Sequence, residues 1–178
     1  MERKTVTIFG SSFPQSGDEE YESAYRLGNY LGKNNLNVCT GGYGGIMDAV
    51  SKGAREAGTE AAGILLESSF ADPSKHLSEK VRTKNLFDRI KILVERGDAY
   101  VILPGGTGTL VELSVIWEFF NKRIMKKKPA AAIGKMWEEI IPVIEERMLN
   151  EKRKTGLIKI FDNYENCAEY IIMKLKND

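Results

Sequence analysis

The chain has 178 residues, and its 26 lysines and arginines nearly balance its 25 aspartates and glutamates. This length favours one domain, residues 1–178, that is large enough to bury a real hydrophobic core. The interspersed, balanced charge argues against a nucleic-acid or membrane surface, and no apolar run reaches the roughly 18 residues of a membrane span. We therefore expect a soluble, cytoplasmic protein that has no nucleic-acid or membrane partner.

Cysteine and histidine are scarce, which limits the possible chemistry. Cys39 and Cys167 lie far apart in the chain, and neither has a partner spaced for a metal site. His76 is the only histidine and falls near a predicted loop, so histidine-rich zinc sites are excluded and a Ser-His-Asp triad would depend on it alone. We expect no metal and no cofactor, and chemistry that rests on carboxylates, arginine, hydroxyls and backbone groups.

Predicted strands and helices alternate along the whole chain. In chain order they are strand 5–9, helix 19–34, strand 36–40, helix 46–57, strand 60–66, a loop at 67–75, an ambiguous and partly extended segment at 76–84, helix 85–96, strand 100–103, a helix after Thr109, strand 129–133, helix 137–150, strand 158–161 and helix 165–176. Pro142 is expected to sit in the first turn of its helix or to kink it. This alternation predicts an α/β fold with a parallel sheet that is covered on both faces.

Three turns rich in glycine or serine, at residues 10–12, 41–45 and 104–109, follow predicted strands. Ligands of parallel sheets bind at the carboxyl ends of the strands, so these turns should line one crevice. Ser11 and Ser12 are equally suited to contact a phosphate or to cap their turn. Met47 fits the core better than a ligand contact. The residues assigned to this part of the crevice are Gly10, Ser11, Ser12, Gly41, Gly42, Gly45 and Met47.

Residues 99–120 read as strand, glycine turn and helix without interruption. The glycines of the turn let the backbone approach a ligand, and the following helix offers free N–H groups and its positive dipole end. This predicts a phosphate site at Gly105, Gly106, Thr107, Gly108 and Thr109. Glu112 lies one turn into the helix, where it either acts beside the phosphate or only stabilises the helix dipole.

The common nucleotide motifs do not match these turns. The P-loop pattern requires Ser or Thr after Gly-Lys, whereas Asn34 follows Gly32-Lys33 and Met136 follows Gly134-Lys135. The dinucleotide pattern fails at its third glycine in both glycine-rich turns. A smaller phosphate ligand, such as a mononucleotide, is therefore the better prediction.

The helix after Thr109 carries apolar residues around nearly its whole circumference, whereas an ordinary covering helix keeps one polar face. One side can pack on the sheet, and we interpret the other as a homodimer surface. The alternative is that helix 137–150 of the same chain covers it.

The stretch Pro104-Gly-Gly-Thr-Gly-Thr-Leu-Val-Glu112 resembles the P-G-G-x-G-T-x-x-E motif of the Lonely Guy family, the cytokinin riboside 5′-monophosphate phosphoribohydrolases. Residues 41–47 resemble the family's G-G-x-x-G-x-M segment, Gly10-Ser11-Ser12 resembles its opening G-S-S, and Arg89 falls where the catalytic arginine stands. The resemblance implies a Rossmann-like, three-layer, doubly wound homodimer. It also implies hydrolysis of the N-glycosidic bond of a nucleoside 5′-monophosphate, of the AMP or cytokinin riboside type, with Arg89 and Glu112 at the scissile bond.

This chemistry suits the residue types. Positive charge develops at the anomeric carbon as the bond breaks, so a carboxylate such as Glu112 can stabilise it. Arg89 can hold the base or stabilise the leaving group, but it is a poor proton donor. Without the resemblance, Arg89 would read as a surface arginine paired with Glu95 or Asp88.

Ile90, Phe87 and Leu93 depart from the family pattern, as do Thr40 before Gly41 and Asp48 after Met47, so the base preference need not be adenine. These departures keep a second hypothesis open, a non-catalytic carrier of a nucleotide or of a phosphate-bearing cofactor, like the molybdenum-cofactor carriers. Lysine decarboxylation is disfavoured because none of the three turns contains a lysine that could bind pyridoxal phosphate.

Overall fold

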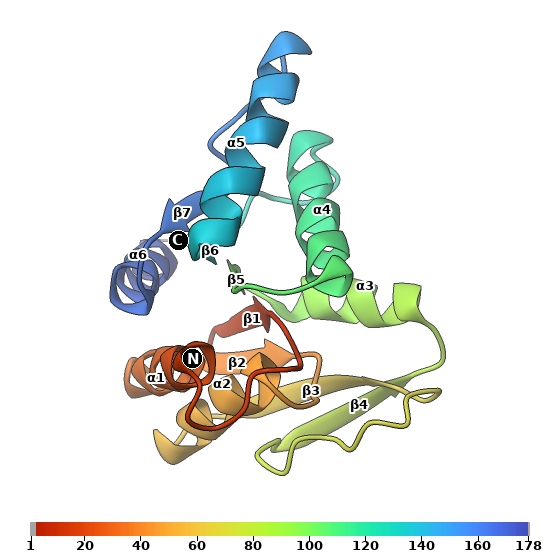
Figure 1. The fold of residues 1–178 in the computed structure, drawn as a ribbon, viewed down its shortest axis with the longest axis vertical. Helices are drawn as coiled ribbons and strands as arrows, with labels where there is room; N and C mark the ends of the chain where they lie inside the picture. Colours follow the sequence, from red (N-terminus) through yellow and green to blue (C-terminus); the bar gives the residue numbers. More distant parts are fainter. Residues whose placement is uncertain (1–2, 178) are drawn as a thin grey trace.

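The computed structural model describes residues 3–177, which build one seven-stranded sheet with six helices around it (Figure 1). The strand order is β4-β3-β2-β1-β5-β6-β7, and all six pairings are parallel. The strands are β1 (Thr5–Phe9), β2 (Asn37–Thr40), β3 (Ala61–Leu66), β4 (Glu79–Thr83), β5 (Ala99–Ile102), β6 (Ala130–Ile133) and β7 (Lys159–Phe161). The helices are α1 (Glu19–Lys33), α2 (Ile46–Glu56), α3 (Leu86–Arg96), α4 (Thr107–Asn121), α5 (Lys135–Asn150) and α6 (Tyr164–Lys176).

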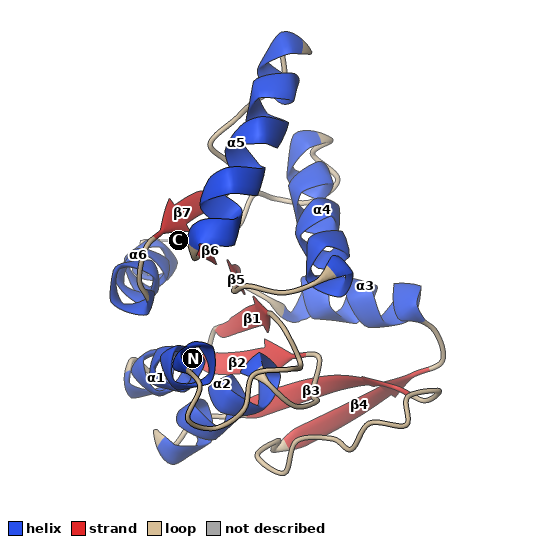
Figure 2. Ribbon diagram, viewed as in Figure 1, coloured by secondary structure: helices blue, strands red, loops and turns tan. Residues whose placement is uncertain are grey.

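The helices divide between the two faces of the sheet (Figure 2). Helices α1, α2 and α6 share one hydrophobic core, and α3, α4 and α5 share the other. This arrangement confirms the predicted doubly wound α/β fold. No helix among residues 3–177 is long and apolar enough to cross a bilayer.

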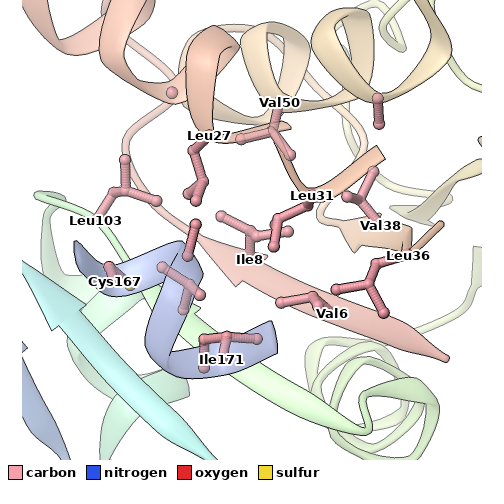
Figure 3. Packing of buried hydrophobic residues seen from close by; sticks show 14 of the residues in the cluster. Val6, Ile8, Leu27, Leu31, Leu36, Val38, Val50, Leu103, Cys167 and Ile171 are labelled. Carbon is pink, nitrogen blue, oxygen red and sulfur yellow. The ribbon is translucent and has the colours of Figure 1, made fainter. Parts of the chain in front are cut away.

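The central strand β1 serves both cores because its side chains alternate between the faces of the sheet. Val6 and Ile8 point to the first core, where they meet Leu27 and Leu31 of α1 (Figure 3). Phe9 belongs to the second core, and the hydroxyl of Thr7 donates a 2.9 Å hydrogen bond to the carbonyl of Leu93 in α3.

Chain connectivity reverses at β1, which pairs with β2 on one side and β5 on the other. Parallel doubly wound sheets bind ligands at such a switch point, outside the carboxyl ends of the strands. The three predicted turns leave the sheet there, after β1, β2 and β5.

Two sequence predictions need correction or sharpening. The ambiguous segment 76–84 contains β4, an edge strand whose register pairs Ala62 with Glu79. Pro142 does not lie in the first turn of α5: the helix begins at Lys135, directly after Gly134 with its φ of 107°, so Pro142 is an interior residue.

Candidate active site

A cavity of about 460 Å³ lies at the carboxyl ends of the central strands, as the three turns predicted. Eleven of the fourteen residues assigned from the sequence line it: Gly10, Ser11, Ser12, Gly41, Met47, Arg89, Gly106, Thr107, Gly108, Thr109 and Glu112. The volume is in the range of small-molecule sites.

The other three assigned residues, Gly42, Gly45 and Gly105, do not line the cavity but lie where the backbone of its turns closely approaches other atoms. Gly45 has a φ of 65°, and a Cβ there would stand 2.4 Å from the carbonyl oxygen of Ser11. A Cβ on Gly105 would meet the Thr109 hydroxyl oxygen at 2.2 Å. These glycines allow the turns after β1, β2 and β5 to approach one another closely.

The amino terminus of α4 opens into the cavity. Its N-cap is Gly106, which offers no side-chain acceptor, and its first turn carries no acidic residue. The N–H groups of residues 107–109 therefore have no capping side chain, and the helix dipole adds positive potential. Gly106 and Gly108 face open space. This end of the cavity is suited to an anion.

Arg89 of α3 is held across the cavity from two sides. Its Nε donates to the carbonyl of Ile64 at 2.8 Å, and its Nη2 donates to the carbonyl of Gly41 at 3.2 Å. A Cβ on Gly41 would stand 2.0 Å from Nη2, so only glycine leaves room for this contact. These two hydrogen bonds therefore fix the orientation of the Arg89 guanidinium at the cavity before any ligand binds.

Glu112 is the partner of Arg89, with 3.8 Å between Oε1 and Nη1. The alternative pairing of Arg89 with Asp88 or Glu95 is absent among the described residues, where Asp88 accepts from Asn85 and Glu95 pairs with Lys91. The Glu112 side chain is only 11% exposed, and its burial raises its pKa from 4.5 to about 7, although Arg89 opposes the shift. A carboxyl group poised near neutrality inside a cavity is typical of catalytic sites.

Several lining residues were not predicted, and Tyr43 is the most informative of them. Its ring lies 5.8 Å from the guanidinium carbon of Arg89. Its hydroxyl accepts a 2.7 Å hydrogen bond from the Leu66 amide and donates to the Leu66 carbonyl at 3.2 Å. Tyr43 thus ties the turn after β2 to the end of β3. The other unpredicted lining residues are Ile8, Phe9, Phe13, Leu66, Ser69 and Ala71.

The departures at Ile90, Phe87 and Leu93 are not equivalent in position. Leu93 and Ile90 are buried in the second core, whereas Phe87 is 83% exposed on the outer side of α3. None of the three lines the main cavity, although Ile90 lines a small neighbouring one of about 190 Å³.

Helix α4 is covered in part by its own chain. Trp117 and Phe120 belong to the same core as Trp137 and Ile141 of α5, as the alternative interpretation of this helix proposed. Val111 is nevertheless 43% exposed, and it lines the same small cavity as the exposed Leu86 of α3.

Comparisons with known proteins agree with this architecture. The model of the SLOG cluster4 family matches residues 3–155. An uncharacterized protein of Archaeoglobus fulgidus is 32% identical over 141 residues, which are 76% of this chain and 87% of that protein. A cytokinin riboside 5′-monophosphate phosphoribohydrolase of Mycobacterium tuberculosis is 32% identical over 118 residues, which are 64% of this chain and 62% of that enzyme.

A pyrimidine/purine nucleotide 5′-monophosphate nucleosidase of Escherichia coli is 33% identical over 105 residues, which are 54% of this chain but only 23% of that enzyme. Among solved structures, the molybdenum cofactor binding protein of Rippkaea orientalis has a TM-score of 0.77 at 21% identity, over 98% of this chain and 99% of that one. That likeness shows a shared fold. The family match and the sequence relatives together show that this chain belongs to the SLOG cluster4 family and is a divergent member of the Lonely Guy group.

Proposed function

We propose that this protein hydrolyses the N-glycosidic bond of a nucleoside 5′-monophosphate and releases the free base and ribose 5-phosphate. The observation that carries the proposal is the Arg89–Glu112 pair, buried 3.8 Å apart in a cavity that the uncapped end of α4 enters. Relatives named as phosphoribohydrolases and as a nucleotide nucleosidase support the same reaction class.

In this proposal the 5′-phosphate binds the turn of residues 105–109 and the first amides of α4. Glu112 lies five residues further along the helix than Thr107, about 7.5 Å along the axis. A ribose held at the phosphate end would therefore present its anomeric carbon toward the carboxylate, which stabilises the developing positive charge. Arg89 contacts the base or the leaving group, and the apolar walls formed by Phe9 and Met47 suit a planar base.

The protein is further inferred to act as one nucleotide-binding domain, because strands from β1 to β7 pair in a single sheet. The exposed apolar residues of α3 and α4 beside the cavity support a homodimer.

The test is a product assay on the purified protein with a panel of nucleoside 5′-monophosphates. Chromatography should detect free base and ribose 5-phosphate from at least one of them. Glu112→Gln should abolish release but leave nucleotide binding largely intact, and Glu146→Gln, on the exposed side of α5, is the matched control. Adenosine should react far more slowly than AMP, since it lacks the phosphate.

If Glu112→Gln releases free base at nearly the wild-type rate, Glu112 is not the catalytic carboxylate. Equal rates on adenosine and AMP would remove the phosphate role from residues 105–109. Nucleotide binding with no release from any member of the panel would favour the carrier hypothesis instead.

A further inference from the structure

A second cavity, of about 520 Å³, lies at the far ends of α4 and α5, which reach the same end of the molecule (Figure 1). It is bounded by the segments that lead into β6 and β7. It therefore lies at the amino-terminal ends of these strands, opposite the candidate active site at the carboxyl ends. Its lining is Phe120, Asn121, Lys122, Arg123, Met125, Lys127, Lys152, Arg153, Lys154 and Leu157. Six of these ten residues are cationic, and none is acidic.

Most of this positive charge is not neutralised. Two of the six cations have carboxylate partners: Lys122 lies 3.7 Å from Glu118, and Arg153 lies 3.4 Å from Glu118 and 3.2 Å from Glu151. The other four have no carboxylate within ion-pair distance in the part of the chain that the structure describes. They are Arg123, Lys127, Lys152 and Lys154.

The backbone conformation at two of the cations is a second, independent observation about this cavity. Helices α4 and α5 both end in a Schellman motif, in which the residue after the C-cap adopts a left-handed conformation. Arg123 has a φ of 55° and Lys152 a φ of 58°. Glycine is the most stable residue at such a position and asparagine the usual substitute, as Asn35 is after α1. The chain instead places a cation at both left-handed positions that border this cavity.

Helix dipoles alone do not explain the cluster. A cation complements the carboxyl end of a helix only within the last turn. Lys127 and Lys154 lie six and four residues beyond the last residues of α4 and α5. Six cations around one cavity also repel one another, so a bound anion would relieve an unfavourable arrangement.

We propose that this cavity binds an oligophosphate group with at least two phosphates, either free or attached to a nucleoside. The cations contact the phosphates, and Phe120, Met125 and Leu157 supply an apolar floor that a nucleoside could cover. The site is separate from the candidate active site, because α4 begins at one and ends at the other, about 22 Å away along its axis.

The test is titration calorimetry with sodium tripolyphosphate on wild-type protein and on the double variant Arg123→Gly/Lys152→Gly. Glycine adopts both left-handed positions without strain, so this variant removes two cations and should keep the wild-type melting temperature. We expect wild type to bind tripolyphosphate with an affinity that falls steeply as salt rises. The double variant should bind at least tenfold more weakly. Asn35→Gly makes the same backbone change after α1 and should bind like wild type.

A second variant, Lys127→Gln/Lys154→Gln, leaves the helix ends untouched and should weaken binding in the same way. Wild-type affinity in both double variants would overturn the proposal. Loss of tripolyphosphate binding in Arg89→Ala would also overturn it, since that result assigns the anion to the candidate active site. A titration with ATP distinguishes the two sources of the phosphate group. If ATP binds tenfold more tightly than tripolyphosphate, a nucleoside covers the apolar floor, and if the two bind equally, the ligand is a free oligophosphate.

Discussion

Gly41 shows how a missing side chain can orient a functional one. Gly41→Ala would place a Cβ 2.0 Å from Nη2 of Arg89 and 2.7 Å from Sδ of Met47. Because the guanidinium is the end of a flexible side chain, we expect Arg89 to move and the fold to remain. Turnover of the preferred nucleotide should fall at least tenfold, which is about 1.4 kcal/mol of transition-state stabilisation, as measured by kcat/KM.

Gly44→Ala is the matched control for this change, since a Cβ there meets only the Ser12 carbonyl oxygen, at 3.5 Å. Its kcat/KM should stay close to wild type. Equal losses in the two variants would mean that the turn, and not the room left for Arg89, determines activity.

Burial of Glu112 predicts an opposition between stability and function. In the folded protein its pKa is about 7, above the ordinary 4.5, so the folded state binds a proton that the unfolded chain releases. This contribution to stability is complete below about pH 4.5 and is lost as the pH rises through 7. Glu112→Gln, which carries no charge, should therefore be more stable than wild type at pH 8, by about 1 to 3 kcal/mol.

Urea unfolding at pH 8 and pH 5 measures this difference, which should nearly vanish at pH 5. Glu146→Gln should show no such pH-dependent gain. If Glu112→Gln is no more stable than wild type at pH 8, the buried negative charge of Glu112 does not destabilise the folded protein.

At the scale of the element, α3 matters because its first turns carry Arg89. The Asn85 side chain caps this helix by accepting from the Asp88 amide at 2.9 Å, and Asn163 caps α6 by accepting from the Asn166 amide at the same distance. Alanine at either position should cost about 1 kcal/mol in the free energy of unfolding. Only Asn85→Ala should also lower kcat/KM, because α3 lines the cavity and α6 does not. Urea unfolding and kcat/KM are measured for both variants in parallel. Equal activity in the two would show that the α3 cap does not influence the position of Arg89.

Most elements could be predicted from the sequence because their signals are local. Glycines follow β1 and β2 directly and β5 after two residues, and apolar spacing of 3.6 residues marks the helices. Strand β4 is ambiguous in the sequence because Glu79, Lys80 and Arg82 are exposed at the sheet edge and only Val81 and Thr83 turn toward the core, too few to make an apolar pattern. The sequence pattern starts α5 at Trp137, two residues after the Lys135 at which the structure begins it.

The candidate site could be predicted in outline for the same reason, since each turn is a local motif. The 3.8 Å approach of Arg89 to Glu112 could not, because it depends on how α3 and α4 pack on the sheet. Tyr43 occupies a variable position of its motif, so nothing marked its contacts with Leu66 and Arg89. The sequence alone favours a solvated loop for the basic run at residues 126–128, because the two halves of the basic cavity lie about 25 residues apart in the chain and meet only in the fold.

At the scale of the whole molecule, the exposed apolar residues beside the cavity predict a dimer. Leu86 and Phe87 of α3 and Val111 of α4 are 47%, 83% and 43% exposed, and Leu86 and Val111 line the same small cavity. Such a patch is costly unless a partner covers it. Size-exclusion chromatography with light scattering should report about twice the 20.0 kDa chain mass at micromolar concentration. Phe87→Asp should yield a monomer, whereas Met173→Glu, on α6, should not. A wild-type monomer would remove the dimer from the proposal.

The central position of β1 has a consequence for how the protein is made. One edge of β1 can pair as soon as β2 is synthesised, but its other edge waits for β5, which begins at residue 99, 59 residues after β2 ends at residue 40. At about 5 to 20 residues per second, the ribosome takes roughly 3 to 12 s to supply it. During that time the nascent chain carries an open edge of the apolar strand β1, which can pair with other chains. Yield in the cell should therefore depend on how well that edge is shielded while β5 is still being translated.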